Sequence, residues 1–395
     1  MYGMKHARNL GWVALSSAQG DRHPIVTVGP YWMGHSSVKI AEVYTSFICL
    51  TLFPRLPYHP RMAQSPAIAT LHSMSDVWDA YRGELDGVED RVRGNLDSSV
   101  TLVNTVAAHI LSGGGKRIRP LLLLLSARLC GYPGADHHQL GSIVEFIHTA
   151  TLLHDDVVDD ADLRRGRRAA RKVWGNQISI LVGDYLYTKA MCKVVEFQNQ
   201  GINEVLAEAC NKMAEGEVLQ LYYNGNPSMP ELEYIKIVEH KTAGLIAAAC
   251  RMGAILAEAS ETQQEALFRF GQYLGIAFQV ADDTLDYIAN GESLGKTIGQ
   301  DLRQGKATLP LLHLLQQCSE QDRQMIKDRM ETRTLSTSDL ERILFLMADF
   351  GSITYAMDRA STYIAAAKHE LERFDDSTAR RAMSVAADYM ITRDR

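Results

Sequence analysis

The sequence of 395 residues predicts an all-α fold, and two observations lead to that prediction. Apolar residues recur at helical spacing over many segments, whereas few segments alternate with the period of a strand. The segment 245–256 is apolar on nearly every side, as expected of a helix buried inside a bundle. We therefore predict a bundle of antiparallel helices around a large central cavity. Glycine- and proline-containing breaks separate the helices at 112–115, 131–134, 224–230 and 290–299.

The predicted helical region begins near Ser75. Ser75 and Asp76 are residues that commonly cap a helix start, and Val77, Tyr81 and Leu85 follow at helical spacing. These features predict the first helix of the domain. Further helices are predicted at 99–111, 120–130, 140–160, 178–197, 203–223, 231–259, 262–287, 309–317, 336–350 and 352–372.

Residues 1–73 differ in character from the rest of the chain. They contain scattered Gly, Pro and Ser without helical periodicity, and their only acids are Asp21 and Glu42. We predict a poorly structured extension ahead of a helical domain at 74–395. Two explanations remain open for this extension: a targeting segment, or a true translation start at Met62 or Met74.

Composition excludes several classes of partner. The chain has 41 Lys and Arg against 47 Asp and Glu, for a formal net charge of -6. No overall positive field would attract nucleic acid, so we predict no nucleic-acid partner. The longest apolar run, 43–53, is shorter than the roughly 20 residues needed to span a bilayer. Six cysteines lack metal-ligand spacing, so we interpret them as small buried hydrophobic residues.

Two copies of a D-D-x-x-D motif each follow an apolar helical run. The copies consist of Asp155, Asp156 and Asp159, and of Asp282, Asp283 and Asp286. Residues four positions apart share one face of a helix, so the outer aspartates of each copy lie together. Such like charges repel unless they bind a cation or protons. One such motif is commonly only a solvated helix end, but two copies on buried helices predict a cation site.

Oxygen-only ligands indicate Mg²⁺, which normally completes its coordination shell with substrate phosphate. The pair of motifs therefore predicts a metal and diphosphate site.

A glycine-rich basic loop supplies the opposite charge. Gly113, Gly114 and Gly115 allow close approach of a ligand, and Lys116, Arg117 and Arg119 follow at once. The loop predicts phosphate binding, although an ordinary solvated connection has the same composition. The spacing is not that of a Walker A loop.

Other polar residues are candidates for the site only because they occur together with the two aspartate motifs and the basic loop. Arg164 and Arg165 follow the first motif closely enough to contact the same phosphates. His148 lies two helical turns before Asp155 and faces roughly the same way. Further cations or polar groups occur at Lys241, Thr242, Lys296 and Lys306.

In order along the chain, these motifs resemble the trans-isoprenyl diphosphate synthase family from about residue 75 to 395. The segments 145–160, 215–221 and 299–310 are most similar to its bacterial octaprenyl-chain members. The resemblance implies an isoprenoid-synthase-type helical fold and a prenyltransferase that condenses isopentenyl diphosphate with an allylic diphosphate. Residues 1–73 have no counterpart in the family pattern.

The resemblance also implies a role for individual residues. Isopentenyl diphosphate would be bound by Lys116, Arg119, His148 and Arg165. The allylic diphosphate would be bound by Arg164, Lys241, Gln279 and Lys296. Asp155, Asp159 and Asp282 would carry about three Mg²⁺ ions with the diphosphate, with Asp156, Asp283 and Asp286 in or near that shell. Lys241 and Thr242 would act at the reacting carbon, with Thr242 beside the carbocation.

Ala150 and Thr151 are predicted to control chain length, because a small residue five positions before Asp155 would leave a product tunnel open. We expect an octaprenyl product for a quinone side chain, from a farnesyl diphosphate primer. A homodimer in the bacterial cytoplasm, in possible peripheral contact with membrane, is also expected.

Three alternatives stay open at this point. The product could be shorter or longer, the chain could be a terpene cyclase or head-to-head condensing enzyme, or it could be a silent regulatory subunit. The basic loop at 114–120 and His148 argue against a cyclase, which needs no isopentenyl diphosphate pocket. Two complete aspartate motifs argue against a silent subunit.

Overall fold

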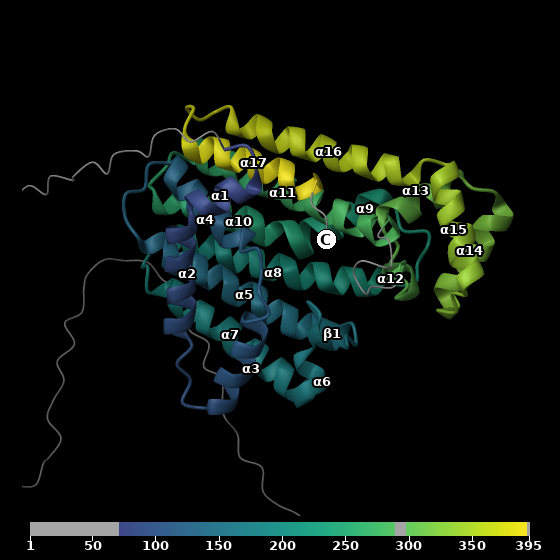
Figure 1. The fold of residues 1–395 in the computed structure, drawn as a ribbon, viewed down its shortest axis with the longest axis horizontal. Coiled ribbons are helices and arrows are strands. Elements are labelled where there is room, and N and C mark those ends of the chain that lie inside the picture. Colours follow the sequence, from purple (N-terminus) through teal and green to yellow (C-terminus); the bar gives the residue numbers. More distant parts are fainter. Residues whose placement is uncertain (1–70, 289–297, 393–395) are drawn as a thin grey trace, which may run out of the picture. The chain divides into compact units, whose positions relative to one another are not determined.

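Figure 1 shows the fold in a computed structural model that describes residues 71–288 and 298–392. Helices make up 78% of these residues, and the single sheet among them consists of two strands. The all-α prediction is therefore confirmed. Residues 1–70 of the extension predicted at 1–73 lie outside the described residues, so that part of the prediction stays a prediction.

The elements from residue 74 to residue 168 include a long helix that ends within the first aspartate motif. Its elements are α1 (Met74–Ala80), α2 (Arg82–Asn95), α3 (Thr101–Leu111), α4 (Ile118–Leu129), α5 (Asp136–Val158), β1 (Leu163–Arg164) and β2 (Arg167–Arg168).

The elements that follow contain the second motif within a single helix. They are α6 (Ala170–Trp174), α7 (Asn176–Val195), α8 (Gln200–Tyr223), α9 (Glu231–Val238), the π-helical η1 (Glu239–Ala243), α10 (Gly244–Leu256) and α11 (Glu261–Ile288). The chain then continues through α12 (Gln300–Arg303), α13 (Leu309–Gln317), α14 (Glu320–Thr332), α15 (Thr337–Asp349), α16 (Ser352–Leu371) and α17 (Thr378–Thr392).

Each of the ten predicted segments after the first contains a helix of the structure, but three details of the prediction were wrong. The cap of α1 is Ser73, which forms a capping box with Asp76, whereas Ser75 lies inside the helix. The helices α6, α12, α14 and α17 were not predicted. The small hairpin of β1 and β2 was also missed, because two-residue strands give no period-2 pattern.

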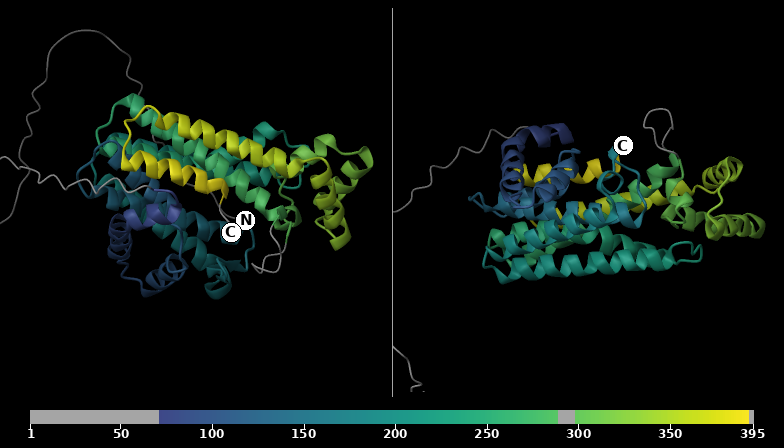
Figure 2. Two further views of the ribbon diagram at one scale, coloured as in Figure 1. Left: turned by 45° about the horizontal axis from the view of Figure 1, so that its top comes forward. Right: turned by 90° about the horizontal axis from the view of Figure 1, so that it is seen from below.

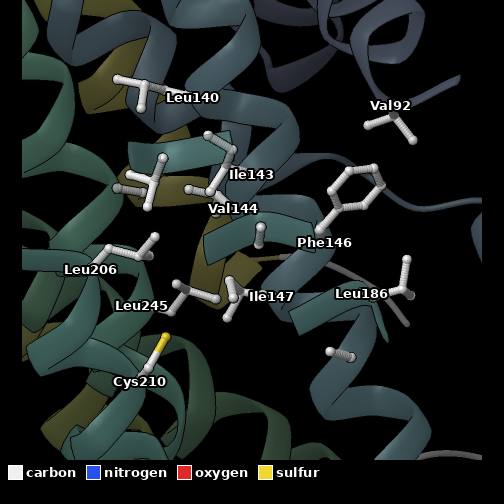
Figure 3. Close-up of a cluster of buried hydrophobic side chains, with 14 of the residues drawn as sticks. Val92, Leu140, Ile143, Val144, Phe146, Ile147, Leu186, Leu206, Cys210 and Leu245 are labelled. Atoms are coloured by element: carbon white, nitrogen blue, oxygen red, sulfur yellow. The ribbon is translucent and has the colours of Figure 1, made fainter. Parts of the chain in front are cut away.

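The helix α5 lies in the middle of one apolar core and carries the first aspartate motif at its end. Figure 3 shows Ile147 of α5 beside Leu245 of α10, with Cys210 of α8 close by. On another side of α5, Phe146 lies between Val92 of α2 and Leu186 of α7, and both Phe146 and Leu186 are fully buried. A buried side chain of this size stabilises the fold by roughly 1.5–3 kcal/mol. This packing fixes α5 as a rigid support for Asp155.

The helix α11 carries the second motif and is covered by the last two helices. In Figures 1 and 2, the yellow helices α16 and α17 lie along α11. Phe270 and Leu274 of α11 belong to one apolar cluster with Ile364 of α16 and Met383 of α17. The C-terminal helices thus hold α11 in place against the rest of the bundle.

The helix α11 approaches the π-helical turn η1 at backbone distance. A Cβ atom added to Gly275 would lie 2.4 Å from the Cα of Ala243, and one added to Gly271 would lie 2.7 Å from the Cα of Ala247. The segment predicted as one helix at 231–259 is continuous through α9, η1 and α10, but η1 widens it by one π-helical turn. That turn brings Lys241 and Thr242 next to α11.

Two further predictions concern membranes and cysteines. Within the described ranges, no helix is long and apolar enough to cross a membrane. Cys210, Cys250 and Cys318 are buried as expected. Cys192 is exposed, which contradicts the prediction that all the cysteines are buried, and Cys130 is half-buried. Cys192 lies at an exposed position of α7, whereas Cys130 follows the last residue of α4 and packs partly against an apolar cluster.

The close approach of α11 to η1 gives a stability prediction. Gly275→Ala is expected to lower the free energy of unfolding by roughly 1–3 kcal/mol, because its methyl group would meet backbone that cannot move aside. Urea denaturation followed by circular dichroism measures this loss. Gly83→Ala in α2 is the matched control, since nothing lies within 4 Å of its added Cβ. The control should raise stability by up to about 1 kcal/mol; equal effects at both sites would contradict the packing argument.

Candidate active site

A cavity of about 1670 Å³ lies among α5, α8, α9, η1 and α11 and is also lined by the glycine-rich loop before α4. Nearly all of the predicted site residues that the structure describes reach its wall. These are Lys116, Arg119, His148, Thr151, Asp155, Asp159, Arg164, Arg165, Lys241, Thr242, Gln279, Asp282, Asp283 and Asp286. Ala150 and Asp156 are the exceptions, and Lys296 lies outside the described residues.

The outer aspartates of the first motif lie on the cavity wall near cationic side chains. Burial raises the pKa of Asp155 to about 6, and the nearby Lys241 only partly offsets that effect. Asp159 follows the last residue of α5, and its Oδ2 is 3.4 Å from the Nζ of Lys306. Asp282 of α11 lines the same cavity. A buried carboxylate with a raised pKa lacks sufficient positive charge around it, which is the condition that favours binding a cation.

Asp156 does not reach the cavity wall, contrary to the prediction that it lies in or near the metal shell. Its side chain is fully buried, and its Oδ1 is 2.6 Å from the Nη2 and 2.8 Å from the Nε of Arg164. A residue adjacent to Asp155 on a helix points about 100° away from it. Asp156 is therefore placed to hold Arg164, whose side chain does line the cavity.

The second motif is held by hydrogen bonds to neutral groups. Asp283 accepts hydrogen bonds from the hydroxyl of Tyr234 and from the Nε2 of Gln279, both at 2.7 Å. Burial raises the pKa of Asp283 to about 8, with a further contribution from Asp301. The Oδ2 of Asp286 accepts a hydrogen bond from the backbone N–H of Asp301 at 2.9 Å. This part of the wall is rigid before any ligand arrives.

The glycine-rich loop places Arg117 in a left-handed conformation at the start of α4, with φ of 49°. Its guanidinium binds Glu89 at 2.5 Å and the buried Glu145 at 2.7 Å. A non-glycine residue in this region of backbone space costs on the order of 1–3 kcal/mol, so surrounding contacts must hold it. The two ion pairs supply those contacts and fix the path of the loop past Lys116.

Arg165 occupies a second left-handed position beside the same loop. Arg165 (φ 51°) and Gly166 (φ 75°) form the two-residue turn between β1 and β2, as in a type I′ hairpin. A Cβ atom added to Gly115 would lie 3.1 Å from the Nη1 of Arg165, so the guanidinium packs closely on the loop at this glycine. The loop and the hairpin therefore form one cationic surface.

His148 is a neutral member of that cationic surface. Its Nε2 is 3.2 Å from the Nη1 of Arg119, which can only donate, so Nε2 accepts. Burial lowers the pKa of His148 well below its usual value, and the charges of Arg119 and Arg165 lower it further. His148 thus holds Arg119 without adding positive charge.

The π-helical turn η1 places Lys241 opposite Asp155. The Nζ of Lys241 lies 2.5 Å from the Oε2 of Glu217 in α8. Burial alone would lower the pKa of Lys241, but the nearby Asp155 and Glu217 raise it, so the ammonium stays charged. A π-helical turn within a helix is frequently found at functional sites.

Ala150, which was predicted to control chain length together with Thr151, does not lie on the cavity wall. Ala150 is packed in the apolar core with 1% of its surface exposed. Five residues along a helix turn through about 140° from Asp155, whereas four residues return to within about 40°. Thr151 therefore faces the cavity, together with Leu152, Met213 and Leu245.

The donor set of the cavity fits a hard divalent cation. Asp155, Asp159 and Asp282 offer only carboxylate oxygens, the ligands that Mg²⁺ prefers. Within the described ranges, three metal-ligating atoms converge only at Glu84, His137 and His138, far along α5 from the motif. The motif aspartates are thus not a closed cage. Mg²⁺ typically binds one or two carboxylates together with substrate phosphate, which matches this arrangement.

Four residues that sequence reasoning left without a role belong to this site. Glu145 fixes Arg117, Glu217 pairs with Lys241, Tyr234 binds Asp283, and Arg117 itself had only been counted among the loop cations. A signal existed for Glu145, because it is a single acid in the apolar run of α5 and must have a buried partner. No local pattern indicated Tyr234 or Glu217.

Comparison with known proteins identifies the chain. Residues 100–347 match the polyprenyl synthetase family. The chain belongs to this family. The octaprenyl diphosphate synthase of Escherichia coli (strain K12) is 42% identical over 312 residues, covering 79% of this chain and 96% of that protein. The all-trans-nonaprenyl-diphosphate synthase (geranyl-diphosphate specific) of Rhodobacter capsulatus is 40% identical over 309 residues, covering 78% of this chain and 94% of that protein.

Solved structures of polyprenyl synthases share the fold. The polyprenyl synthase from Caulobacter crescentus CB15, complexed with calcium and isoprenyl diphosphate, has a TM-score of 0.78 and 38% identity to this polyprenyl synthetase. The match covers 81% of this chain and 98% of that one. The protein is therefore a prenyltransferase and a trans-polyprenyl diphosphate synthase, of a family that uses a divalent metal with isopentenyl and allylic diphosphates.

The raised pKa of Asp155 predicts how stability depends on pH in the metal-free protein. Because the folded pKa of about 6 is above the ordinary aspartate value of 3.8, the folded protein loses stability as the pH rises through that window. Asp155→Asn cannot ionise, so in EDTA at about pH 7.5 it should melt a few degrees above the wild type. The difference should shrink below pH 6 and vanish near pH 4; a difference that is constant across this range would rule out the assigned pKa.

Proposed function

We propose that this synthase adds isopentenyl diphosphate repeatedly, head to tail, to farnesyl diphosphate and releases octaprenyl diphosphate for a quinone side chain. The observation that carries the proposal is the single cavity, in which a cationic loop and the two aspartate motifs face one another above an apolar wall. The identity to an octaprenyl diphosphate synthase over most of the chain supports the chain length.

Isopentenyl diphosphate would bind at the cationic surface made by the glycine-rich loop and the β1–β2 turn. Lys116, Arg119 and Arg165 line this part of the cavity, and His148 holds Arg119. Bidentate arginines suit a diphosphate because their paired N–H groups match two phosphate oxygens.

The allylic diphosphate would bind between the two aspartate motifs. Asp155, Asp159 and Asp282 would hold the Mg²⁺ ions, about three in number. Lys241, Arg164 and Gln279 line the cavity beside these aspartates and would contact the same diphosphate. Lys296 is proposed to join them.

Catalysis would begin when the allylic C–O bond breaks and the diphosphate leaves with the bonding electrons. Bound Mg²⁺ would neutralise the charge that develops on that leaving group. Lys241 adds a fixed positive charge on the same side, since its partner carboxylates keep it protonated. The double bond of isopentenyl diphosphate then attacks the allylic carbon, and the departing diphosphate takes the proton that is lost.

Below the reacting carbon, the cavity wall becomes apolar and would hold the growing chain. Thr151 and Leu152 of α5, Met213 of α8 and Leu245 of α10 form this wall. Small and aliphatic side chains there leave room for a long product. The same surface excludes water, which would otherwise quench the carbocation as an alcohol.

Two further aspects of the proposal concern assembly and location. A homodimer is supported by large apolar side chains exposed on α7 and α8, among them Leu181 at 61% and Tyr222 at 77%. We place the enzyme in the bacterial cytoplasm. Peripheral contact with membrane is supported by the exposed Leu163 beside the exposed Arg167 and Arg168. Sedimentation with anionic liposomes tests that contact.

The proposed function is tested by incubating purified protein with labelled isopentenyl diphosphate, farnesyl diphosphate and Mg²⁺. Chromatography of the dephosphorylated products should show a ladder that ends near eight isoprene units. Asp155→Ala should lose at least about 10²-fold in rate, while Asp349→Ala, an exposed aspartate of α15, should match the wild type. A chain that extends no primer alone would instead support a regulatory subunit.

The apolar wall predicts the product length of a variant. Thr151→Phe should shorten the product by several isoprene units, because its ring would project into the cavity one turn below Asp155. Reversed-phase chromatography of the products measures the shift. Thr105→Phe, at an exposed position of α3, is the matched control and should leave the product unchanged. Full-length product from Thr151→Phe would contradict the proposed path of the chain.

A further inference from the structure

Tyr234 lies at one end of a chain of hydrogen bonds that crosses the active-site wall. Its hydroxyl donates to the Oδ2 of Asp283 at 2.7 Å, and the Oδ1 of Asp283 accepts from the Nε2 of Gln279 at 2.7 Å. The Oε1 of Gln279 accepts from the hydroxyl of Thr242 at 2.9 Å. Three elements, α9, η1 and α11, are linked in this way.

The order of donors and acceptors along this chain fixes the orientation of the Gln279 amide. The carboxyl oxygen Oδ1 of Asp283 accepts a hydrogen bond from Gln279 if Asp283 is ionised, and also if it carries a proton on Oδ2. The NH₂ group of Gln279 must therefore face Asp283, and its carbonyl oxygen must face Thr242. The carbonyl oxygen can only accept, so the Thr242 hydroxyl must donate to it.

The direction of the Thr242 hydroxyl matters because Thr242 lines the cavity where the allylic carbocation would form. With its proton directed at Gln279, the hydroxyl presents oxygen lone pairs to the cavity rather than a positive hydrogen. A fixed dipole with its negative end toward a developing cation lowers the energy of the transition state without a cost of reorientation.

We propose that Tyr234 is a positioning residue for ionisation of the allylic diphosphate, acting through Asp283 and Gln279 on the orientation of the Thr242 hydroxyl. This inference rests on the proposed function. Tyr234 is 4% exposed, and its hydroxyl is linked to the Thr242 hydroxyl through Asp283 and Gln279. Without its hydroxyl, Asp283 loses a fixed donor and can turn, which frees the Gln279 amide and the Thr242 hydroxyl to reorient.

The test is Tyr234→Phe, which keeps the ring and removes only the hydroxyl. We expect kcat to fall on the order of tenfold, less than the 10²–10³ typical of losing a direct donor. The KM values for both substrates should change less than kcat, because Gln279 is one of several groups proposed to contact the allylic diphosphate and the others keep their partners. Release of diphosphate from the allylic substrate alone should fall by the same factor as kcat.

Tyr287→Phe is the matched control. Tyr287 is buried on the same helix as Asp283 and forms one hydrogen bond, 2.8 Å to the Oγ1 of Thr308, outside the chain that reaches Thr242. Both variants remove one buried hydroxyl, so both should lower the melting temperature by a similar amount. Only Tyr234→Phe should lower kcat; equal kcat values in the two variants would overturn the proposal.

A double-mutant cycle separates a positioning role from a general loss of structure. Thr242→Val removes the hydroxyl on which Tyr234 is proposed to act, so adding Tyr234→Phe to that variant should cost no further activity. Losses that multiply would show that Tyr234 acts independently of Thr242. Extension by the wild-type enzyme tests the proposed function separately, so the positioning role can fail while that function stands.

Discussion

The arrangement of this enzyme depends on keeping unlike charges close together inside an apolar bundle without letting them neutralise one another completely. Asp155 has a raised pKa although Lys241 is nearby, because Lys241 is shared with Glu217 and cannot compensate both carboxylates and the cost of burial. The unsatisfied negative charge creates a place for a cation and a diphosphate. The long apolar helices α5 and α11 are what hold these carboxylates away from bulk water.

Irregular backbone is concentrated around the cavity and positions its cationic side. Arg117 and Arg165 both have positive φ, and η1 interrupts the helix that carries Lys241. Each conformation is held by contacts from elsewhere: Arg117 by Glu89 and Glu145, and η1 by its close packing on Gly275. Strain that is held by neighbouring contacts keeps the diphosphate-facing groups in place before substrate arrives.

The sequence predicted the fold class, most helices and most residues on the cavity wall, because these follow from periodicity, charge and local motifs. It missed α14, whose exposed polar surface leaves only Ile326 and Met330 buried. It also missed the partners that hold the site: Glu145 lies 28 residues from Arg117, and Tyr234 lies 49 residues from Asp283. Such pairs form only through tertiary packing. Ala150 was chosen by its distance along the helix, and the rotation about the helix axis places the neighbouring Thr151 on the cavity wall.

The two aspartate motifs have the same pattern, but the second aspartate of each motif binds different partners. The second aspartate of each motif must turn about 100° from the first, toward the neighbouring structure. Asp156 meets the guanidinium of Arg164, whereas Asp283 meets the neutral donors of Tyr234 and Gln279. In both cases the bound partner, Arg164 or Gln279, also lines the cavity. The second aspartate of each motif therefore links its helix to a side chain on the cavity wall, and Asp283, unlike Asp156, also lines the cavity itself.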